Sequence, residues 1–435
     1  MSVLSSIIQL IVALSVLIIL HEFGHFLAAR LMKVKVEEFG LGFPPQAKRL
    51  WRGRSKFKLG STEITAPTGR HLTQDLEAGQ WADIITKPRE EDGTHILQSI
   101  TILDTSSDDL EIQRKITPDG LVHMRGEISS LKMNTLYSLN WLPLGGFVRL
   151  KGEVDDQDAP GGLHAASPWA RLLIYFAGPL MNLLVGALIF AFMYTQTGAP
   201  DLTRVQVIGI SPGSPAEQVG LQDGDIITYA AGEKITSTEK LSQTIYSHLG
   251  EDVDLTFMRG EEVYEVSLVP RENPPEGEGA IGIFMSYPIK PVGFFDALPF
   301  GAQATYYYSL FLVSIPGEVI RGAIEPSLAR PVGYKGIYDA YQYVQQQEEP
   351  VPKSPISLNI MRFFASISIS LGMLNLLPIP ALDGGRILFT LPEIVIRRRI
   401  PIEWQNVINM ISITALIALF LYINLLDFTN PIQFP

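Results

Sequence analysis

Three residues near the N-terminus have the types and spacing of a metal-dependent hydrolase site. The stretch LIILHEFGHFLAAR (residues 17–30) contains His21, Glu22 and His25 in an H-E-x-x-H pattern. On a helix, the two histidines lie four residues apart on one face, so both imidazoles can reach one metal ion. The glutamate between them can take a proton from a water in the open coordination position. The pattern therefore predicts a zinc site with Glu22 as the general base.

A simpler explanation is that these residues are polar groups at the end of a helix, reaching toward the membrane interface. The preceding segment, residues 3–20, carries no charge and is just long enough for a short spanning helix. Ionisable groups in a spanning helix are costly and by default functional, which favours the metal site. Nothing basic precedes the apolar run, so we interpret it as a retained helix and not as a secretory signal.

Two histidines leave a third metal ligand to be found. We expect it in NLLPIPALDGGRI (375–387), where two prolines break a helix and Gly384 with Gly385 lets Asp383 face inward. A carboxylate completes a two-histidine, one-carboxylate set and leaves the fourth position for water. The alternative is that Asp383 only caps the following short helix. These ligand types make one zinc ion per chain the expected cofactor.

The overall composition indicates a membrane protein with water-exposed parts. Only 18% of the 435 residues are charged, and the mean hydropathy is +0.19. A net charge of −11 argues against a nucleic-acid partner. The absence of cysteine excludes disulfides and a thiolate zinc site.

Four apolar runs are candidates for membrane-spanning helices. Gly178-Pro179 interrupts the second run, which a membrane bundle tolerates where neighbouring helices satisfy the freed backbone groups. Basic residues crowd positions 30–58 and 397–399, and the positive-inside rule makes both regions cytoplasmic. The HEFGH and LDGG motifs then share the cytoplasmic side, with both termini and residues 195–360 outside. The four runs are residues 3–20, 172–194, 363–382 and 407–426.

Three further segments have recognisable patterns. Residues 59–134 are polar with strand-like stretches and predict a small β-rich cytoplasmic insertion. Residues 136–153 are apolar, aromatic and glycine-containing, as expected for a β-hairpin that dips into the membrane edge where protein covers it. Residues 294–315 contain a tyrosine cluster and suit an interfacial helix. A fifth span there would move the LDGG motif to the wrong side.

Residues 201–270 resemble a PDZ domain. The resemblance rests on the turn GSPAEQVGL, on DGDII at the start of a buried strand, and on the helix that ends at Gly250. PDZ domains add an extended peptide tail to a sheet edge. The alternative is a domain that acts as a steric plug or spacer.

Together these motifs resemble the site-2 protease family of intramembrane zinc metalloproteases, in particular its bacterial regulator-of-sigma-E protease branch. The resemblance covers nearly the whole chain except residues 59–134. Two features depart from the family's pattern: the chain has room for a single PDZ domain, and it carries the insertion. The motifs are HEFGH, GLGFPP (40–45), LPLGGFVRLKGE (142–153), FAGPLMN (176–182) and NLLPIPALDGG (375–385).

The resemblance implies a role for each matching residue. His21, His25 and Asp383 would bind zinc, and Glu22 would be the general base. Asn375 would lie near the substrate or the oxyanion. The substrate-binding residues would further include Gly145, Gly146 and Phe147, in a β element whose edge pairs with an unwound substrate segment, and Asn182, in a supporting role that positions substrate or metal ligands.

The resemblance also implies a substrate and a location. The substrate would be a single-pass transmembrane protein, such as an anti-sigma factor already trimmed outside or a remnant signal peptide. The enzyme would lie among the lipids of the bacterial cytoplasmic (inner) membrane, with its active site toward the cytoplasm and the PDZ domain outside. Two alternatives remain: a membrane scaffold with a vestigial metal site, and a tethered zinc protease that cuts soluble substrates.

The expected fold is an α-helical multi-pass membrane protein with about four transmembrane helices, a membrane-associated β-hairpin region, an extracytoplasmic α+β PDZ domain and a small β-rich cytoplasmic insertion. The expected divisions are 1–58 (first helix and membrane β element), 59–134 (insertion), 135–196 (hairpin and second helix), 197–275 (PDZ), 276–355 (extracytoplasmic and interfacial helical segment) and 356–435 (third and fourth helices).

Overall fold

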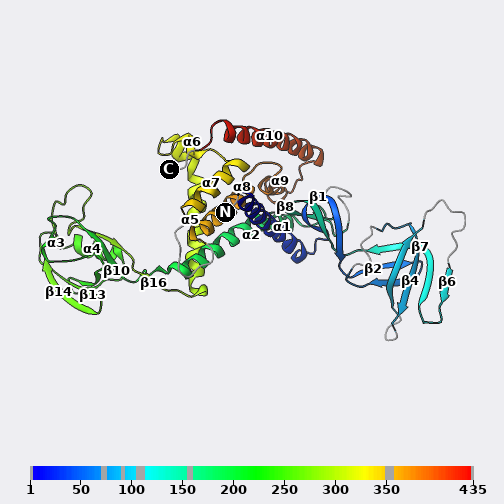
Figure 1. Cartoon of the computed structure of the whole chain (residues 1–435), viewed down its shortest axis with the longest axis horizontal. Coiled ribbons are helices and arrows are strands. Elements are labelled where there is room, and N and C mark those ends of the chain that lie inside the picture. The colour runs from blue at the N-terminus through cyan, green and yellow to red at the C-terminus, as the bar shows by residue number, and fades with distance from the viewer. Residues whose placement is uncertain are drawn as a thin grey trace. The chain divides into compact units, whose positions relative to one another are not determined.

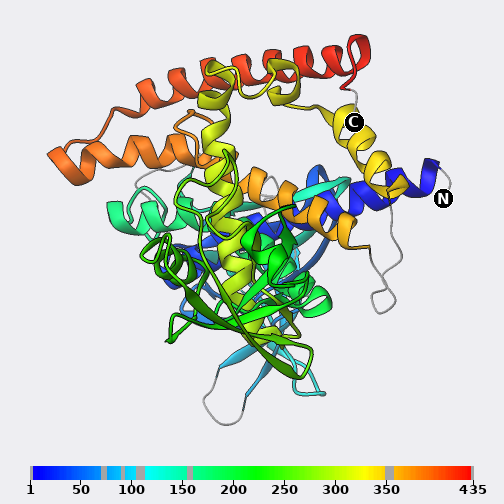
Figure 2. The same ribbon diagram turned by 90° about the vertical axis from the view of Figure 1, so that its left-hand side faces the viewer.

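The computed structural model describes residues 3–69, 76–89, 94–103, 113–153, 160–347 and 357–432 (Figures 1 and 2). The chain forms two compact units. One comprises residues 1–189 and 304–435, and contains the helical bundle and the insertion. The other comprises residues 190–303. The expected boundary between residues 355 and 356 lies outside the described residues.

The described part of the chain contains four helices long and apolar enough to cross a membrane, as expected for a multi-pass protein. The third ends at Asn375, seven residues before the expected end at 382, because Pro378 and Pro380 cannot continue its hydrogen-bond ladder. The chain becomes helical again at α9 (Asp383–Ile396). The four helices are α1 (Val3–Leu31), α2 (Pro168–Thr197), α8 (Leu358–Asn375) and α10 (Ile402–Thr429).

Helices α1, α2 and α8 pack closely through small residues. A Cβ added to Gly24 of α1 would lie 2.3 Å from the carbonyl oxygen of Ala177 in α2. A Cβ added to Gly372 of α8 would lie 2.9 Å from the carbonyl oxygen of Pro179. Small residues of this kind let helix backbones approach within a membrane, where packing drives helix association.

Two long strands, β1 (Val36–Arg52) and β8 (Leu136–Leu150), pair with each other and bend back on themselves. Residues 38–41 of β1 therefore have partners at both 136–139 and 146–149 of β8. Val148 of β8 points its backbone N–H toward α1 and donates it to Glu22. The region expected to form a β-hairpin is thus strand β8, which pairs with β1 beside α1. We call β1 and β8 together the folded strand pair.

The insertion forms a closed β-barrel, since β2 pairs with both β3 and β7. Its strand order is β2-β3-β5-β4-β7, with β6 added alongside β7. Phe57, Ile64, Ile84 and Ile128 are among its buried core residues. The barrel begins before the expected residue 59. Its strands are β2 (Ser55–Leu59), β3 (Thr62–Ala66), β4 (Trp81–Pro88), β5 (His95–Ile102), β6 (Gln113–Ile116) and β7 (Val122–Lys132).

The second unit is built on a sheet of order β14-β13-β11-β10-β15 around its own apolar core. The GSPAEQ stretch starts α3 (Pro215–Gln218), and Ser214 caps it by accepting the N–H of Glu217. Strand β15 comes from beyond the expected limit at residue 275 and pairs with β10. The elements are β10 (Val205–Ile210), β11 (Ile226–Ala230), α4 (Thr238–Tyr246), β13 (Val253–Arg259), β14 (Glu262–Leu268) and β15 (Ile283–Ser286).

Helix α5 (Phe294–Ile320) begins within the second unit and continues beyond residue 303, and α6 (Pro326–Ala329) and α7 (Tyr334–Gln346) come after it in the chain. Asp427 near the end of α10 accepts hydrogen bonds from the backbone N–H groups of Gly333 and Gly336. These bonds link α10 to the start of α7. A buried carboxylate at a helix N-terminus satisfies free N–H groups and complements the helix dipole.

Candidate metal centre

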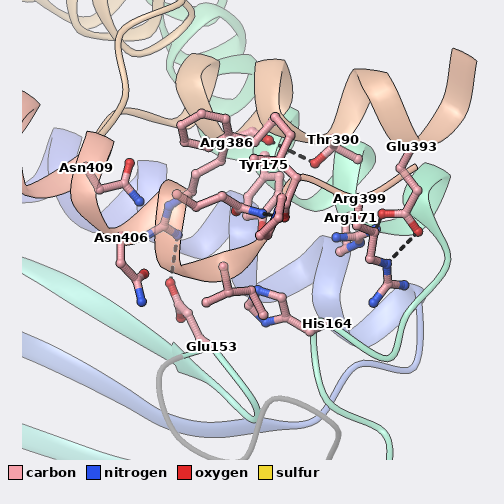
Figure 3. A pocket seen from close by; sticks show the side chains of 15 residues that line it. Glu153, His164, Arg171, Tyr175, Arg386, Thr390, Glu393, Arg399, Asn406 and Asn409 are labelled. Atoms are coloured by element: carbon pink, nitrogen blue, oxygen red, sulfur yellow. Dashed lines mark hydrogen bonds and ion pairs between the residues drawn. The ribbon is translucent and has the colours of Figure 1, made fainter. Parts of the chain in front are cut away.

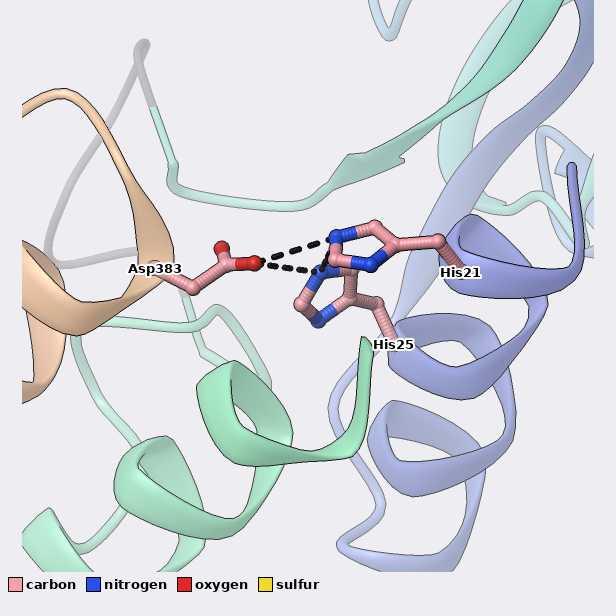
Figure 4. A group of neighbouring side chains, drawn as sticks. All are labelled: His21, His25 and Asp383. Atoms are coloured by element: carbon pink, nitrogen blue, oxygen red, sulfur yellow. Dashed lines mark hydrogen bonds and ion pairs between the residues drawn. The ribbon is translucent and has the colours of Figure 1, made fainter. Parts of the chain in front are cut away.

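The three predicted metal ligands come together between two helices (Figure 4). Helix α1 presents His21 and His25 on one face, and Asp383 is the first residue of α9. Oδ2 of Asp383 lies 3.1 Å from Nε2 of His21 and 3.2 Å from Nε2 of His25. The two Nε2 atoms are 3.2 Å apart. Three potential ligand atoms thus form a nearly equilateral triangle.

The triangle has the size that a zinc ion requires. With bonds of about 2.05 Å, tetrahedral ligand atoms lie about 3.3 Å from one another, which is within a few tenths of an ångström of the distances observed here. The donor set is the two-imidazole, one-carboxylate combination that leaves one position open. The residues present therefore fit zinc.

The other ring nitrogen of His25 is held by the backbone. Its Nδ1 lies 2.7 Å from the carbonyl oxygen of Ile174 in α2, which can only accept a hydrogen bond. The proton of a neutral His25 must then reside on Nδ1, and the lone pair of Nε2 faces the other ligand atoms. Metal-binding histidines usually have their second nitrogen fixed in this way.

Asn182 of α2 contacts the second ring nitrogen of His21 in the corresponding way. Its fully buried side-chain amide lies 3.1 Å from Nδ1 of His21 through Nδ2, while Oδ1 has no partner among the described residues. A half-turn of the amide places Oδ1 against His21 as an acceptor for Nδ1–H. In that orientation Nε2 of His21 also has a free lone pair to offer a metal.

Gly178 of α2 forms a wall of the site. A Cβ at this position would lie 2.2 Å from Nε2 of His25 and 2.8 Å from Nε2 of His21. Sequence reasoning recognised Gly178 only as part of a helix-breaking Gly-Pro pair and missed this contact. The signal that could have found it is its place in FAGPLMN, four residues before Asn182.

A backbone hydrogen bond from β8 holds the side chain of Glu22. Its Oε2 accepts the backbone N–H of Val148 in β8 at 3.2 Å. Glu22 follows His21 directly on α1, and its side chain is half-buried. A carboxylate is therefore held between the metal ligands and the folded strand pair.

Comparison with known proteins identifies the family. The sequence profile of Peptidase family M50 matches residues 9–66 and 126–419, most of the chain. The chain belongs to Peptidase family M50. It is 26% identical to the zinc metalloprotease RasP of Oceanobacillus iheyensis over 97% of this chain and 98% of that protein. It is also 26% identical to the regulator of sigma-W protease RasP of Bacillus subtilis, over 96% of this chain and 97% of that protein.

The family membership confirms the expected zinc metalloprotease of the site-2 type, and with it zinc as the cofactor. With four apolar helices, this M50 peptidase is a multi-pass intramembrane enzyme. One solved structure, the PDZ domain of the SdrC-like protein of Listeria monocytogenes, is 26% identical over 19% of this chain and 85% of that chain, with a TM-score of 0.17.

Glycines shape the turn that carries Asp383 in this peptidase. A Cβ on Gly384 would lie 2.1 Å from the carbonyl oxygen of Leu377, and one on Gly385 would lie 2.4 Å from that of Ile379. Any larger residue would push the start of α9 away from the preceding segment. The glycine pair was expected to permit a turn, and the contacts show that it permits close backbone approach.

The remaining candidate residues lie in β8 and at the end of α8. Gly145 has φ +98° and packs against Ile18 of α1, while Gly146 approaches the backbone of Gly40 in β1. Phe147 is half-buried in the same strand. Asn375 donates its amide to the carbonyl oxygen of Leu371 in its own helix at 3.0 Å. Asn182 thus contacts the metal ligand His21, whereas Asn375 is hydrogen-bonded within α8.

Proposed function

We propose that this M50 peptidase hydrolyses peptide bonds within or near the spanning segments of single-pass membrane proteins. The observation that carries this proposal is that two of the three ligands, His21 and His25, lie on α1, a helix with an 18-residue window apolar enough to cross a membrane. The name of the B. subtilis relative, a regulator of sigma-W protease, supports regulated intramembrane proteolysis. An anti-sigma factor or a remnant signal peptide is the class of substrate that fits.

In this proposal His21, His25 and Asp383 hold the zinc ion. When bound, zinc supplies Lewis-acid chemistry: it lowers the pKa of a water and polarises a carbonyl. Glu22 takes the proton of the attacking water and delivers it to the leaving amine, as a general base that becomes a general acid. The N–H of Val148 orients the Glu22 carboxylate for this transfer.

Asn182 is a positioning residue in this proposal, and not a substrate ligand. Its Oδ1, turned toward His21, accepts Nδ1–H and so selects the tautomer that leaves Nε2 free. The support is the buried contact with His21 and the lack of another partner for Oδ1 in the described part of the chain.

The folded strand pair provides a surface for an extended substrate. A helical substrate segment has its amides satisfied and its carbonyls hidden, so it must unwind before it can be cut. Pairing with a strand edge would hold the unwound segment. Gly145, Gly146 and Phe147 lie in the part of β8 nearest α1 and suit this role. Asn375 would serve as an amide donor to the substrate once its bond to Leu371 opens.

The orientation follows from the basic residues. Positions 30–58 and 397–399 would face the cytoplasm of a bacterial inner membrane, which places the metal centre near the cytoplasmic side. Residues 197–275 would then stand outside as a PDZ-like domain, where they filter substrates by size or bind a peptide tail. Lipid would cover the exposed apolar faces of the four helices.

The test is cleavage of a tagged single-pass reporter by the full chain in nanodiscs. We expect the wild type to cut within the reporter's span, and Glu22→Gln or a zinc chelator to abolish cutting. Glu403→Gln is the matched control, because Glu403 is an exposed carboxylate in another apolar helix. Equal activity of Glu22→Gln and wild type, with zinc bound in both, would overturn the proposal and favour a scaffold function.

A further inference from the structure

A polar cavity of about 230 Å³ lies beside the metal centre, between the starts of α2 and α10 and the body of α9 (Figure 3). Its lining is strongly charged although it lies between helices that are otherwise apolar. Three arginines and two glutamates give it a net charge of +1 before His164 is counted. These charged residues are Arg171, Arg386, Arg399, Glu153 and Glu393.

Both carboxylates are already paired. Glu393 forms ion pairs with Arg171 and with Nε of Arg399, and Glu153 accepts a hydrogen bond from Arg386 at 2.7 Å. Burial opposes ionisation of Glu393, but the hydrogen bonds from the two arginines outweigh it and lower the pKa of its carboxyl group. The acidic residues of the cavity therefore have little capacity left for further donors.

Arginine donors remain unused in this cavity. The side chain of Arg171 is only 8% exposed, and its buried Nε has no hydrogen-bond partner in the described part of the chain. The side chain of Arg399 is 53% exposed; its Nε donates to Glu393, and its two Nη atoms have no protein partner in the described part of the chain. A buried donor without an acceptor is costly. The cavity thus combines one buried arginine donor that lacks an acceptor with exposed arginine donors at its edge, and its arginines outnumber its glutamates by one.

The start of α10 adds uncharged polar groups. Gln405, Asn406 and Asn409 line the cavity from a helix that is otherwise apolar. Asn409 accepts the N–H of Ala381, while the exposed Asn406 amide has no protein partner among the described residues. These amides add neutral donors and acceptors to the charged lining of the cavity.

Two tryptophans indicate the depth of the cavity in a membrane. Trp169 in the first turn of α2 is 67% exposed, and Trp404 in the first turn of α10 is 64% exposed. Exposed tryptophans at helix ends are typical of the membrane–water interface. The two helix starts border the cavity, so it lies at the level of lipid phosphates. Arg397 and Arg398 are exposed beside it.

We propose that this cavity binds a phosphate ester of net negative charge, with Nε of Arg171 and the Nη atoms of Arg399 as charge-assisted donors and Asn406 as an additional donor. Arginine matches the geometry of phosphate oxygens, and basic pockets between helices at the membrane surface bind anionic headgroups. The ester can belong to an anionic phospholipid or to a soluble phosphate. Arg386 lies one turn after Asp383, so a phosphate bound here would brace the helix that carries the metal ligand.

The test is native mass spectrometry of the full chain in nanodiscs and in detergent, with three probes: phosphatidylglycerol, phosphatidylcholine and glycerol 3-phosphate. We expect one phosphatidylglycerol or glycerol 3-phosphate to be retained per chain, and phosphatidylcholine not to compete. Arg399→Gln should reduce retention at least fivefold. Arg398→Gln is the matched control, because Arg398 carries the same charge at the neighbouring position but does not line the cavity.

Asn406→Leu gives a second variant that keeps all ion pairs, and it should reduce retention about threefold. Retention of phosphatidylglycerol alone would assign the site to a lipid headgroup, and retention of both anionic probes to a phosphate group in general. Equal loss in Arg398→Gln and Arg399→Gln would show a bulk charge effect and overturn the proposal. So would wild-type retention in both Arg399→Gln and Asn406→Leu.

Discussion

The metal centre and the polar cavity are neighbouring polar sites that both involve α2 and α9, yet they are built in opposite ways. In the metal centre the side chains are short, and the second nitrogen of each histidine has a neighbour. The space around it is filled, since one carbon added at Gly178 would lie 2.2 Å from a ligand atom. The cavity is lined by long side chains, holds about 230 Å³ and keeps arginine donors unpaired.

This difference separates a rigid site from an adaptable one. Catalysis needs ligand atoms fixed to within about half an ångström, which close packing and backbone contacts supply. A site for an ester of variable shape needs donors on flexible stems that can adjust. We therefore expect that one added methyl group is enough to weaken zinc binding at the metal centre. The cavity should tolerate changes of similar size.

The largest effect is expected for Gly178→Ala. The new methyl group would overlap the imidazole of His25, and zinc affinity should fall by about 100-fold or more. Bound zinc is measured by elemental mass spectrometry on purified protein, with the melting temperature recorded in parallel. Gly317→Ala is the control, because a Cβ at Gly317 meets no atom within 4 Å. A folded Gly178→Ala protein with full zinc content would show that the site is not rigid.

A second prediction concerns the contact between Asn182 and His21. Asn182→Leu removes the acceptor for Nδ1–H and should weaken zinc binding about 10- to 100-fold. Asn182→Asp keeps an oxygen acceptor and should retain most of the affinity. Asn375→Leu should leave zinc affinity unchanged and lower only proteolysis. Competition with a fluorescent chelator measures all three variants. Equal affinities for Asn182→Leu and wild type would remove Asn182 from the metal site.

A smaller effect is expected from the ion pairs of the cavity. Glu393→Gln removes the partner of Arg171 and Arg399 and should cost about 1–2 kcal/mol of stability, without a change in zinc affinity. The pKa of Glu393 is lowered in the folded state, so its contribution is complete above about pH 4.3 and is lost as the pH falls through the lowered value. The melting temperatures of variant and wild type should therefore converge at acidic pH. A difference in melting temperature that does not shrink as the pH falls below about 4.3 would contradict this assignment.

The smallest effect is expected outside both sites. Lys56 and Glu63 form an ion pair at the exposed surface of the barrel. Exposed pairs contribute little because water and salt screen them. Glu63→Gln should leave zinc content, lipid retention and melting temperature unchanged within error. A clear shift would mean that the barrel is coupled to one of the two polar sites.

The main parts of the site could be predicted from local patterns in the sequence. His21 and His25 are brought together by helix periodicity alone, and the prolines and glycines around Asp383 predicted a break that turns this residue inward. The four apolar runs predicted four helices because a spanning helix requires a long uncharged stretch. These features depend on residues close to one another in the chain.

The missed features depend on how distant segments meet. The close approach of Gly178 to His25 requires the crossing point of α1 and α2, which no local pattern specifies. Asn182 was expected to support the site, but its contact with Nδ1 of His21 depends on the same crossing point. The pairing of Arg171 with Glu393 joins residues more than 200 positions apart. The closure of the barrel by β2 and β7, and the addition of β15 to β10, likewise depend on long-range register.

The place where the barrel joins the rest of the chain has a practical consequence. Arg52 and Leu136, the last residue of β1 and the first of β8, are direct partners across the strand pair, and Gly53 donates its N–H to Thr135. The barrel thus leaves and re-enters the scaffold at a single point, and the M50 profile skips residues 67–125 inside it. We therefore expect that a short turn can replace the barrel while the strand pair is kept, and that another domain with adjacent termini can be inserted at the same point.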